Sequence, residues 1–399
     1  MGKQAIEWKR ISVHELCEAI IDCVNKTAPT VEGPTPFRMI RTTNVKSGWV
    51  DTSTVNYVDA KTYQKWIRRG APRRGDVILT REAPLGEVGL LRDDTGVFLG
   101  QRLVMYRANP KRLDNRFLLY SLLSHEVQGQ IKSFGSGSTV EHMRVPDCEN
   151  IEIQVPPLHT QWKIATILSA YDDLIENNLR RIKILEEMTQ NLYREWFVKF
   201  RFPGHQKTRF ANSPLGKIPE GWEVKKLGEI LVLNYGKALK QEDRRRGNSP
   251  VYGSSGVVGY HDVPLVNGPG IIVGRKGNVG SIFWSDEDYY AIDTAYFVTS
   301  KLPLRFLFFD LQTKNFLNND AAVPGLNRNQ AYSLETVIPS LKILKWFCKF
   351  ADDFERHAAV LRLQNTILHR TRDLLLPRLI SGEVDVSELD ITVPEEIVV

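Results

Sequence analysis

The sequence lacks the short motifs that mark most enzyme active sites. There is no GxxxxGKS or GxxxxGKT loop for a nucleotide phosphate, and Gly135-x-Gly137 lacks the third glycine of a dinucleotide fingerprint and follows a helical pattern. The eight histidines form no HxH or HExxH pair. No Asn-Pro-Pro-aromatic or Asp-Pro-Pro-aromatic tetrapeptide is present, which argues against an amino-methyltransferase site. We therefore expect no catalytic residue, bound cofactor or metal in this chain.

Cysteine is scarce, and long apolar runs are absent. The four cysteines, Cys17, Cys23, Cys148 and Cys348, lack metal-ligand spacing and are typical of reduced thiols rather than a disulfide framework. No stretch approaches the roughly 18 apolar residues needed to cross a membrane. No apolar run follows the first residues, so we expect no signal peptide and a cytoplasmic protein. The net charge of +6 is compatible with a nucleic-acid partner without requiring one.

The two halves of the chain share similar segments in the same order. After the last of them, each half continues into a long helical pattern that carries an aspartate pair, Asp172-Asp173 or Asp352-Asp353. Two copies of this length indicate a tandem duplication with pseudo-twofold symmetry, not a solenoid. Such a molecule is suited to measuring two sites on one extended partner. The matching segments are Trp8–Leu16 with Trp222–Ile230, Val77–Arg81 with Ile271–Arg275, and Val155–Leu158 with Ile338–Leu341.

Each half is predicted to be a mixed domain of short strands and helices followed by one long helix, an α+β fold overall. Helical spacing predicts a helix from Phe117 to Ile131 in the first domain and from Leu304 to Leu317 in the second. The Pro/Gly-rich stretch between the first long helix and the second domain predicts a surface linker. The predicted segments are the first domain at 1–158, the first long helix at 159–200, the linker at 201–221, the second domain at 222–341, the second long helix at 342–381 and a tail at 382–399.

Both long helices carry a stripe with alternating four-three spacing, as a two-helix seam requires. We expect the helices to pair with each other, antiparallel, each about 40 residues and roughly 60 Å long, with Pro377 near the end of the second. The alternative is that each helix packs only on its own domain. The second stripe includes His357 and Gln364. The pairing residues are predicted to be Ile175, Ile182, Leu185, Leu192, Phe354, Leu361 and Leu368.

Loops that combine glycine with basic and amide side chains are the candidate DNA contacts. Glycine allows the backbone to approach a polyanion closely, Arg and Lys bind phosphate or guanine, and Asn can pair with adenine. The alternative is a solvated basic face with turn glycines. The candidates in the second half are Lys240, Arg244, Arg245, Ser254, Ser255, Arg275, Lys276, Asn278, Asn327, Arg328 and Asn329. Those in the first half are Thr80, Arg81, His142 and Arg144.

Several of these stretches, in this order, resemble the specificity subunits of type I restriction-modification systems. The resemblance covers essentially the whole chain. The first domain is less typical, because it carries Thr80-Arg81-Glu82-Ala83-Pro84 where the second carries Gly274-Arg275-Lys276-Gly277-Asn278. The stretches that resemble the family are Trp196–Trp222, Val251–Gly256, Gly274–Gly280, Ala291–Tyr296 and Arg372–Glu383.

The resemblance implies two target recognition domains held apart by an antiparallel helical pair. Each domain would read one half of a bipartite double-stranded DNA sequence, with half-sites roughly one turn, about 34 Å, apart and the helices setting the spacer. Two methylation subunits would dock on the outer faces of the helices, and restriction subunits would join that assembly. S-adenosylmethionine, ATP and magnesium would belong to those partners.

Two functions of other classes stay open at this point. One is a stand-alone nuclease that uses the region of Asp147 and Glu152, although the lysine of a nuclease carboxylate cluster is missing. The other is a protein-interaction scaffold whose basic loops are incidental. A scaffold predicts no DNA affinity at moderate salt, whereas phosphate contacts predict a steep salt dependence.

Overall fold

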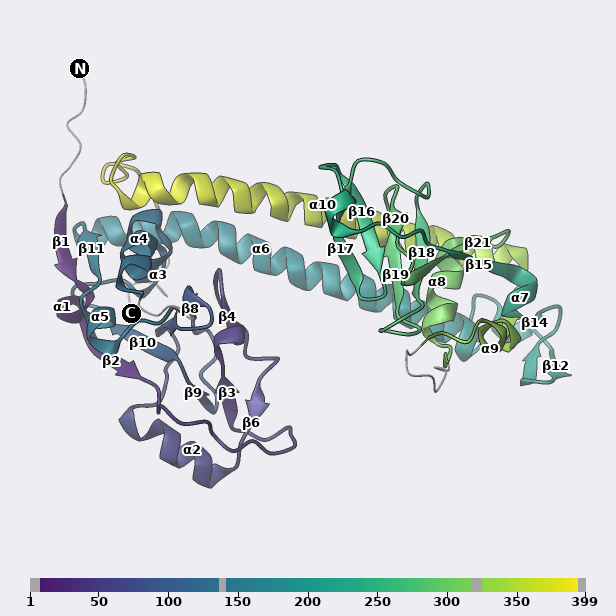
Figure 1. Cartoon of the computed structure of the whole chain (residues 1–399), viewed down its shortest axis with the longest axis horizontal. Coiled ribbons are helices and arrows are strands. Elements are labelled where there is room, and N and C mark those ends of the chain that lie inside the picture. Colours follow the sequence, from purple (N-terminus) through teal and green to yellow (C-terminus); the bar gives the residue numbers. More distant parts are fainter. Residues whose placement is uncertain (1–7, 136–140, 317–324, 394–399) are drawn as a thin grey trace, which may run out of the picture. The chain divides into compact units, whose positions relative to one another are not determined.

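The computed structural model describes residues 8–135, 141–316 and 325–393. The chain forms two compact units, Met1–Asn178 with Leu363–Val399, and Leu179–Arg362. Each unit holds one mixed domain together with parts of the same two long helices (Figure 1). Among the described residues, no helix is long and apolar enough to cross a membrane.

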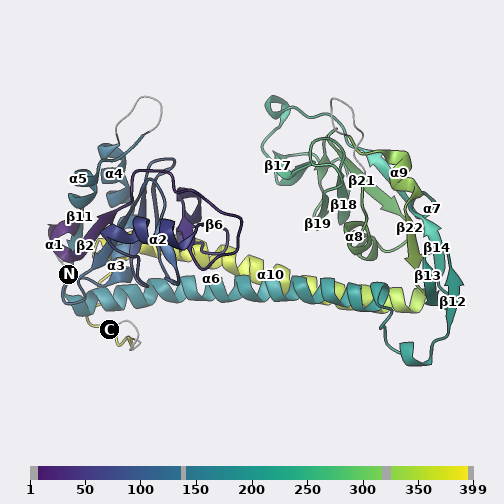
Figure 2. The ribbon, with the colours of Figure 1, turned by 90° about the horizontal axis from the view of Figure 1, so that it is seen from below.

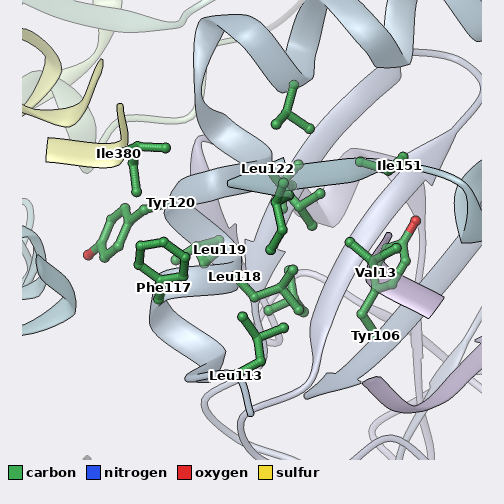
Figure 3. Packing of buried hydrophobic residues seen from close by; sticks show 14 of the residues in the cluster. Val13, Tyr106, Leu113, Phe117, Leu118, Leu119, Tyr120, Leu122, Ile151 and Ile380 are labelled. Atoms are coloured by element: carbon green, nitrogen blue, oxygen red, sulfur yellow. The ribbon is translucent and has the colours of Figure 1, made fainter. Parts of the chain in front are cut away.

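The first unit is built on a six-stranded sheet whose inner strands are buried. Helices α3 (Asn115–Leu123) and α4 (His125–Phe134) belong to the same hydrophobic core as strands β7 and β10. Figure 3 shows Ile380 beside Phe117 and Tyr120 of α3 in this core. The strand order is β2 (Cys17–Asp22), β10 (Leu103–Ala108), β7 (Val77–Arg81), β8 (Leu85–Leu90), β5 (Gly48–Val50) and β4 (Val45–Lys46).

Smaller elements complete the first unit. A three-stranded sheet carries helix α2 (Ala60–Trp66) close to it, and strand β1 (Lys9–Ser12) leads into the short helix α1 (Val13–Leu16). The remaining elements are β6 (Asn56–Tyr57), β3 (Arg38–Ile40) and β9 (Val97–Leu99) in that sheet, and β11 (Glu152–Val155), which pairs with β1 and follows helix α5 (Val145–Glu149).

The second unit repeats this plan on a four-stranded sheet. The order is β15 (Leu231–Tyr235), β21 (Ala295–Ser300), β18 (Gly270–Gly274) and β19 (Ile282–Ser285). A three-stranded sheet follows the order β17 (Gly256–His261), β16 (Ser249–Gly253) and β20 (Tyr290–Ala291). The other elements are β12 (Phe210–Ser213), β13 (Gly216–Pro219), β14 (Glu223–Lys226), α7 (Leu227–Ile230), α8 (Leu304–Gln312), α9 (Arg328–Ser333) and β22 (Glu335–Ile338).

Backbone hydrogen bonds align the two copies residue by residue. Arg81 N–H donates to Arg102 O at 2.8 Å, and Arg275 N–H donates to Thr294 O at 2.9 Å. The carbonyl of Arg81 accepts from Met143 N, and that of Arg275 accepts from Leu326 N. Cys23 N donates to Leu103 O just as Gly236 N donates to Ala295 O. Arg81 and Arg275 therefore occupy corresponding positions, and the predicted duplication is confirmed at the level of strand pairing.

The predicted helix from Phe117 to Ile131 is wrong in one respect, since it is two helices. Ser124 ends α3 in an extended conformation, and its hydroxyl accepts the Val127 N–H of α4. Serine favours a cap over a helix interior because its hydroxyl competes for backbone groups. In the second domain α8 ends at Gln312, and Leu317, the predicted end, lies outside the described residues.

The long helices α6 (Leu158–Tyr193) and α10 (Leu341–Ile380) pair antiparallel in each unit (Figure 2). In the first unit Asn178 Nδ2 donates to Asn365 Oδ1 at 2.9 Å, and Arg372 pairs with Asp172 at 2.5 Å. In the second unit Arg362 pairs with Glu186 at 2.8 Å, and Ile182 packs with Ala358 and Leu361. Residue numbers rise on α6 as they fall on α10, so the predicted antiparallel pairing is confirmed.

Two positions of the predicted helix pair need correction. His357 and Gln364 are exposed, and the neighbouring Ala358 and Asn365 are buried in the seam instead. Pro377 lies in the last turn of α10, which ends at Ile380. A proline in the last turn loses one backbone hydrogen bond, and the burial of Leu379 and Ile380 in the first core offsets that loss. Of the predicted pairing residues, Ile175, Ile182 and Leu361 are buried, and Leu185, Leu192, Phe354 and Leu368 are half-buried.

Candidate nucleic-acid interface

Tyr235 and Arg275 meet at one edge of the second sheet. Strands β15 and β18 both pair antiparallel with β21, so their carboxyl ends lie at the same edge. Tyr235 is the last residue of β15, and Arg275 directly follows β18. The guanidinium carbon of Arg275 lies 4.9 Å from the centre of the Tyr235 ring and 5.8 Å from that of Tyr296. Its Nη1 donates to the carbonyl of Asp293 at 2.7 Å.

Arg328 approaches the same ring from helix α9. Its guanidinium carbon lies 5.3 Å from the centre of the Tyr235 ring. Its Nε and Nη2 both donate to the Tyr332 hydroxyl, at 3.0 and 2.9 Å. Hydrogen bonds from Tyr296 and then Arg328 lower the pKa of the Tyr235 hydroxyl. Tyr235 is nevertheless 52% exposed, so a charged aromatic surface faces solvent here.

The loop after Arg275 brings three more predicted residues together. Asn278 Nδ2 donates to Ser255 Oγ at 3.3 Å, and the Ser254 carbonyl accepts from Ser281 Oγ at 2.6 Å. The loop can fold this tightly because residue 274 is glycine: a Cβ there would lie 2.0 Å from the Asn278 carbonyl oxygen. Ser254, Ser255, Arg275 and Asn278 therefore belong to one surface, although Ser254 itself is buried.

The remaining basic and amide candidates of the second domain have other contacts. Asn327 Oδ1 accepts the Gln330 N–H and caps α9, while Asn329 is exposed. Arg244 donates to the carbonyl of Val258 on β17, and Arg245 pairs with Asp262 at 3.0 Å. Lys240 lies 3.9 Å from Glu242, and Lys276 forms a backbone bridge with Gly325. Arg244 thus contacts β17, Arg245 contacts the residue directly after β17, and Lys240 contacts a residue two positions farther along the chain. These contacts are separate from those of Arg275.

In the first domain two of the four candidates are turned toward the protein. Thr80 is fully buried, and its hydroxyl accepts the Glu87 N–H at 2.9 Å. Arg81 is half-buried and donates to the Met143 carbonyl at 3.1 Å. His142 forms a backbone bridge with Glu82. His142 and Arg144 are both exposed, and Arg144 holds Asp147 through two hydrogen bonds of 2.9 and 3.0 Å.

The carboxylates of the nuclease alternative are not gathered into a site. The hydrogen bond from Arg144 lowers the pKa of Asp147, and the backbone carbonyl and N–H of Glu152 bond to the side-chain amide of Gln130. Within residues 8–135, 141–316 and 325–393, no group of three or more His, Cys, Asp or Glu side chains is placed to hold a metal ion.

Sequence reasoning missed the tyrosines of this surface. Tyr235 stands directly before Gly236-Lys237, and Tyr332 lies four residues after Arg328. Aromatic residues interleaved with basic ones are a signal for nucleic-acid binding. This signal could have identified Tyr235 and Tyr332 as well as their basic neighbours. Tyr296 lies within a stretch that resembles the family, without any side-chain role assigned to it.

The outer face of α10 in the first unit carries exposed apolar side chains. Leu363, Ile367 and Leu374 are each more than half exposed. Helical periodicity places them on the side away from Asn365 and Arg372, which face α6. An apolar stripe on the outside of a helix pair is typical of a surface that another protein covers.

Comparison with known proteins finds similarity to one family in both halves of the chain. The family model described as "Type I restriction modification DNA specificity domain" matches residues 6–187 and 219–365. The chain is 26% identical over 348 residues to the specificity subunit of the type I restriction enzyme MjaIX of Methanocaldococcus jannaschii, covering 79% of each chain. It is 31% identical over 190 residues to the MjaVIII specificity subunit of the same organism, covering 45% of this chain and 44% of the relative.

A solved structure shows the same fold. The S subunit of a type I restriction-modification system from M. genitalium has a TM-score of 0.57 and 20% identity, and the match covers 94% of this chain and 97% of that one.

Proposed function

Because this chain belongs to the type I restriction-modification DNA specificity family, we propose that it is the subunit that selects the DNA target of a type I restriction-modification complex. The duplication carries this proposal, since the family model matches each copy and the copies align hydrogen bond by hydrogen bond. Two similar domains of one chain are suited to two half-sites on opposite DNA strands.

Each domain reads one half of a bipartite sequence, and the paired helices α6 and α10 set the spacer between the halves. In the second domain the reading surface is the sheet edge that carries Arg275, Lys276, Asn278 and Tyr235. The Arg275 guanidinium has the donor geometry for guanine, and the Asn278 amide has that for adenine. In the first domain, Arg144 and the backbone around Arg81 occupy the corresponding edge.

The chain supplies recognition and its partners supply chemistry. Two methylation subunits dock on the outer helix faces, where Leu363, Ile367 and Leu374 offer an apolar stripe, and restriction subunits join that assembly. S-adenosylmethionine, ATP and magnesium are bound by those partners, and this chain is not an enzyme. We place the complex in the cytoplasm of a prokaryotic cell.

Methylation mapping by long-read sequencing tests this function. Cells that co-express this chain and its candidate methylation subunit should gain one split, adenine-methylated motif, which is lost when this chain is omitted. A stable co-purifying complex without new methylation would contradict the proposal and favour a scaffold.

Domain exchange separates the roles of the two halves. Replacing residues 1–158 by the first domain of another family member should change one half of the methylated motif and leave the other half and the spacer intact. A change in both halves would contradict the assignment of one half-site to each domain.

A further inference from the structure

We propose that Arg275 reads a guanine in the half-site of the second domain, and that Tyr235 and Arg328 hold its guanidinium in the reading orientation. These three residues are called the Tyr235 platform below. The inference rests on the proposed function, and it adds a specificity-determining residue together with two positioning residues.

The contacts of Arg275 fix the plane of its guanidinium. The group contacts the rings of both Tyr235 and Tyr296, which contact each other, and Nη1 is anchored on the Asp293 carbonyl at 2.7 Å. The Asp293 carbonyl and the Tyr296 hydroxyl both accept hydrogen bonds from Arg275, but they do not use all of its N–H groups. The side chain thus keeps donors for a ligand while losing rotational freedom.

Arg328 secures the ring against which Arg275 packs. It is tied to the Tyr332 hydroxyl by two hydrogen bonds and lies 5.3 Å from the centre of the Tyr235 ring. The Tyr332 hydroxyl also accepts the Leu233 N–H of β15, the strand that ends in Tyr235. The platform is therefore attached to β15 at two points, its last residue Tyr235 and, through Tyr332, its middle residue Leu233.

Charge makes a polyanion the fitting ligand. Within the part of the chain that the structure describes, the contacts of Arg275 and Arg328 are with tyrosine rings, a tyrosine hydroxyl and a backbone carbonyl, and neither forms an ion pair with a carboxylate. Two unneutralised guanidinium groups beside a half-exposed ring provide both a positive field and a flat surface.

The rigidity of the platform favours a base over a phosphate. Phosphate oxygens are satisfied by flexible basic side chains at many angles, and such contacts carry no sequence information. Guanine presents O6 and N7 in one plane, which a guanidinium matches with two hydrogen bonds only in one orientation. Holding the group in that orientation beforehand lowers the entropy lost on binding.

Among its described residues, the first domain has no such platform. Backbone pairing places Asp22 where the second domain has Tyr235, Val104 where it has Tyr296, and Val145 where it has Arg328. Asp22 pairs with Arg69, so this position holds an ion pair in place of an aromatic ring. The inference therefore applies to one half-site only.

The test maps methylation in cells that co-express the methylation subunit with the wild-type chain or a variant. Arg275→Ala should relax recognition at a single G·C pair, in the half-site of the second domain, with a loss of discrimination of roughly five- to 150-fold. Tyr235→Ala should relax the same position, and Tyr235→Phe, which keeps the ring, should recover most of that loss. The double variant should be no worse than Arg275→Ala, since both changes act through one contact.

Arg246→Ala is the matched control, because it removes one exposed positive charge of the same domain outside the platform. Its methylated motif should equal that of the wild type. The inference is overturned if Arg275→Ala weakens methylation uniformly across sequences and lowers the salt slope, which is the behaviour of a phosphate contact. It is also overturned if the relaxed position lies in the other half-site. No motif with the wild-type chain would instead overturn the proposed function itself.

Discussion

Asp114 caps helix α3 from inside the protein. Its Oδ1 accepts the Phe117 N–H at 2.7 Å, its own N–H donates to Gln161 Oε1 at 2.9 Å, and the residue is only 5% exposed. Burial raises the pKa of its carboxyl from 3.8 to about 6, against the opposing effect of the Phe117 hydrogen bond. The folded state is therefore less stable when the Asp114 carboxyl is ionised than when it is protonated.

This cost predicts a pH dependence of stability. Between the unfolded pKa of 3.8 and the folded value of about 6, the folded state binds more protons, so stability falls as pH rises through this window. The change amounts to about 3 kcal/mol at about 1.4 kcal/mol per pKa unit. Asp114→Asn keeps a capping oxygen and should remove this slope. Hydrogen exchange of the α3 amides at pH 4 to 7 measures it, and an unchanged slope would contradict the assignment.

At the residue scale the sequence identified some residues that lie together on the candidate surface of the second domain. Arg275, Asn278 and Ser255 do lie together, because a glycine-rich turn after a strand fixes the local geometry. Thr80, in contrast, is buried although it borders the corresponding turn. Val77 to Thr80 are buried on both faces of the sheet, so no alternation of polar and apolar residues marks which side chain points outward.

Among the elements, the helix pair has a polar centre within an otherwise apolar seam. In the first unit Asn178 pairs with Asn365, and about two turns farther along Arg372 pairs with Asp172, whose other oxygen accepts the Tyr120 hydroxyl at 2.6 Å. Such pairs are satisfied in one register only, so they oppose a slip of α10 along α6.

Breaking one of these pairs should destabilise the first unit. Arg372→Met leaves the buried Asp172 without its cation, and removal of one partner of a buried ion pair costs about 3–5 kcal/mol. The double variant Arg372→Met with Asp172→Leu should recover much of that loss, because no charge then stays buried. Thermal unfolding of both variants checks this, and equal melting temperatures for wild type and Arg372→Met would contradict it.

The stripe on α6 follows the predicted spacing, because most of its seam residues are large and apolar and the others lie between them in the pattern. The stripe on α10 was shifted at two positions, since His357 and Gln364 keep a four-three spacing with Leu361 while Ala358 and Asn365 make the contact. A small or polar residue in a seam carries little hydrophobic signal, and the pairing of Asn365 with Asn178 is known only from the structure.

For the whole molecule, the first unit is discontinuous in sequence. Its core includes Leu376, Leu379 and Ile380 from the end of α10, and Lys163 Nζ donates to the carbonyls of Ser387 and Leu389, both at 2.7 Å. The second unit, Leu179–Arg362, is continuous.

A leucine near the end of the chain should therefore control the stability of the N-terminal domain. Leu379→Ala should cost about 2–5 kcal/mol, as for other buried leucines, and should lower hydrogen-exchange protection in α3 while leaving β15 and β21 unaffected. Leu374→Ala is the matched control, because this leucine is 63% exposed. Equal protection losses in both units, or none in α3, would contradict the discontinuous core.

The discontinuous first unit also has a consequence for synthesis on the ribosome. Residues leave the ribosome from the N-terminus onward, so the second unit has all its residues before the first unit has Leu379 and Ile380. The roughly 200 residues between Asn178 and Ile380 take on the order of 10–40 s to translate. During that interval the N-terminal domain has been synthesised but lacks part of its core. The second unit is therefore complete before the first.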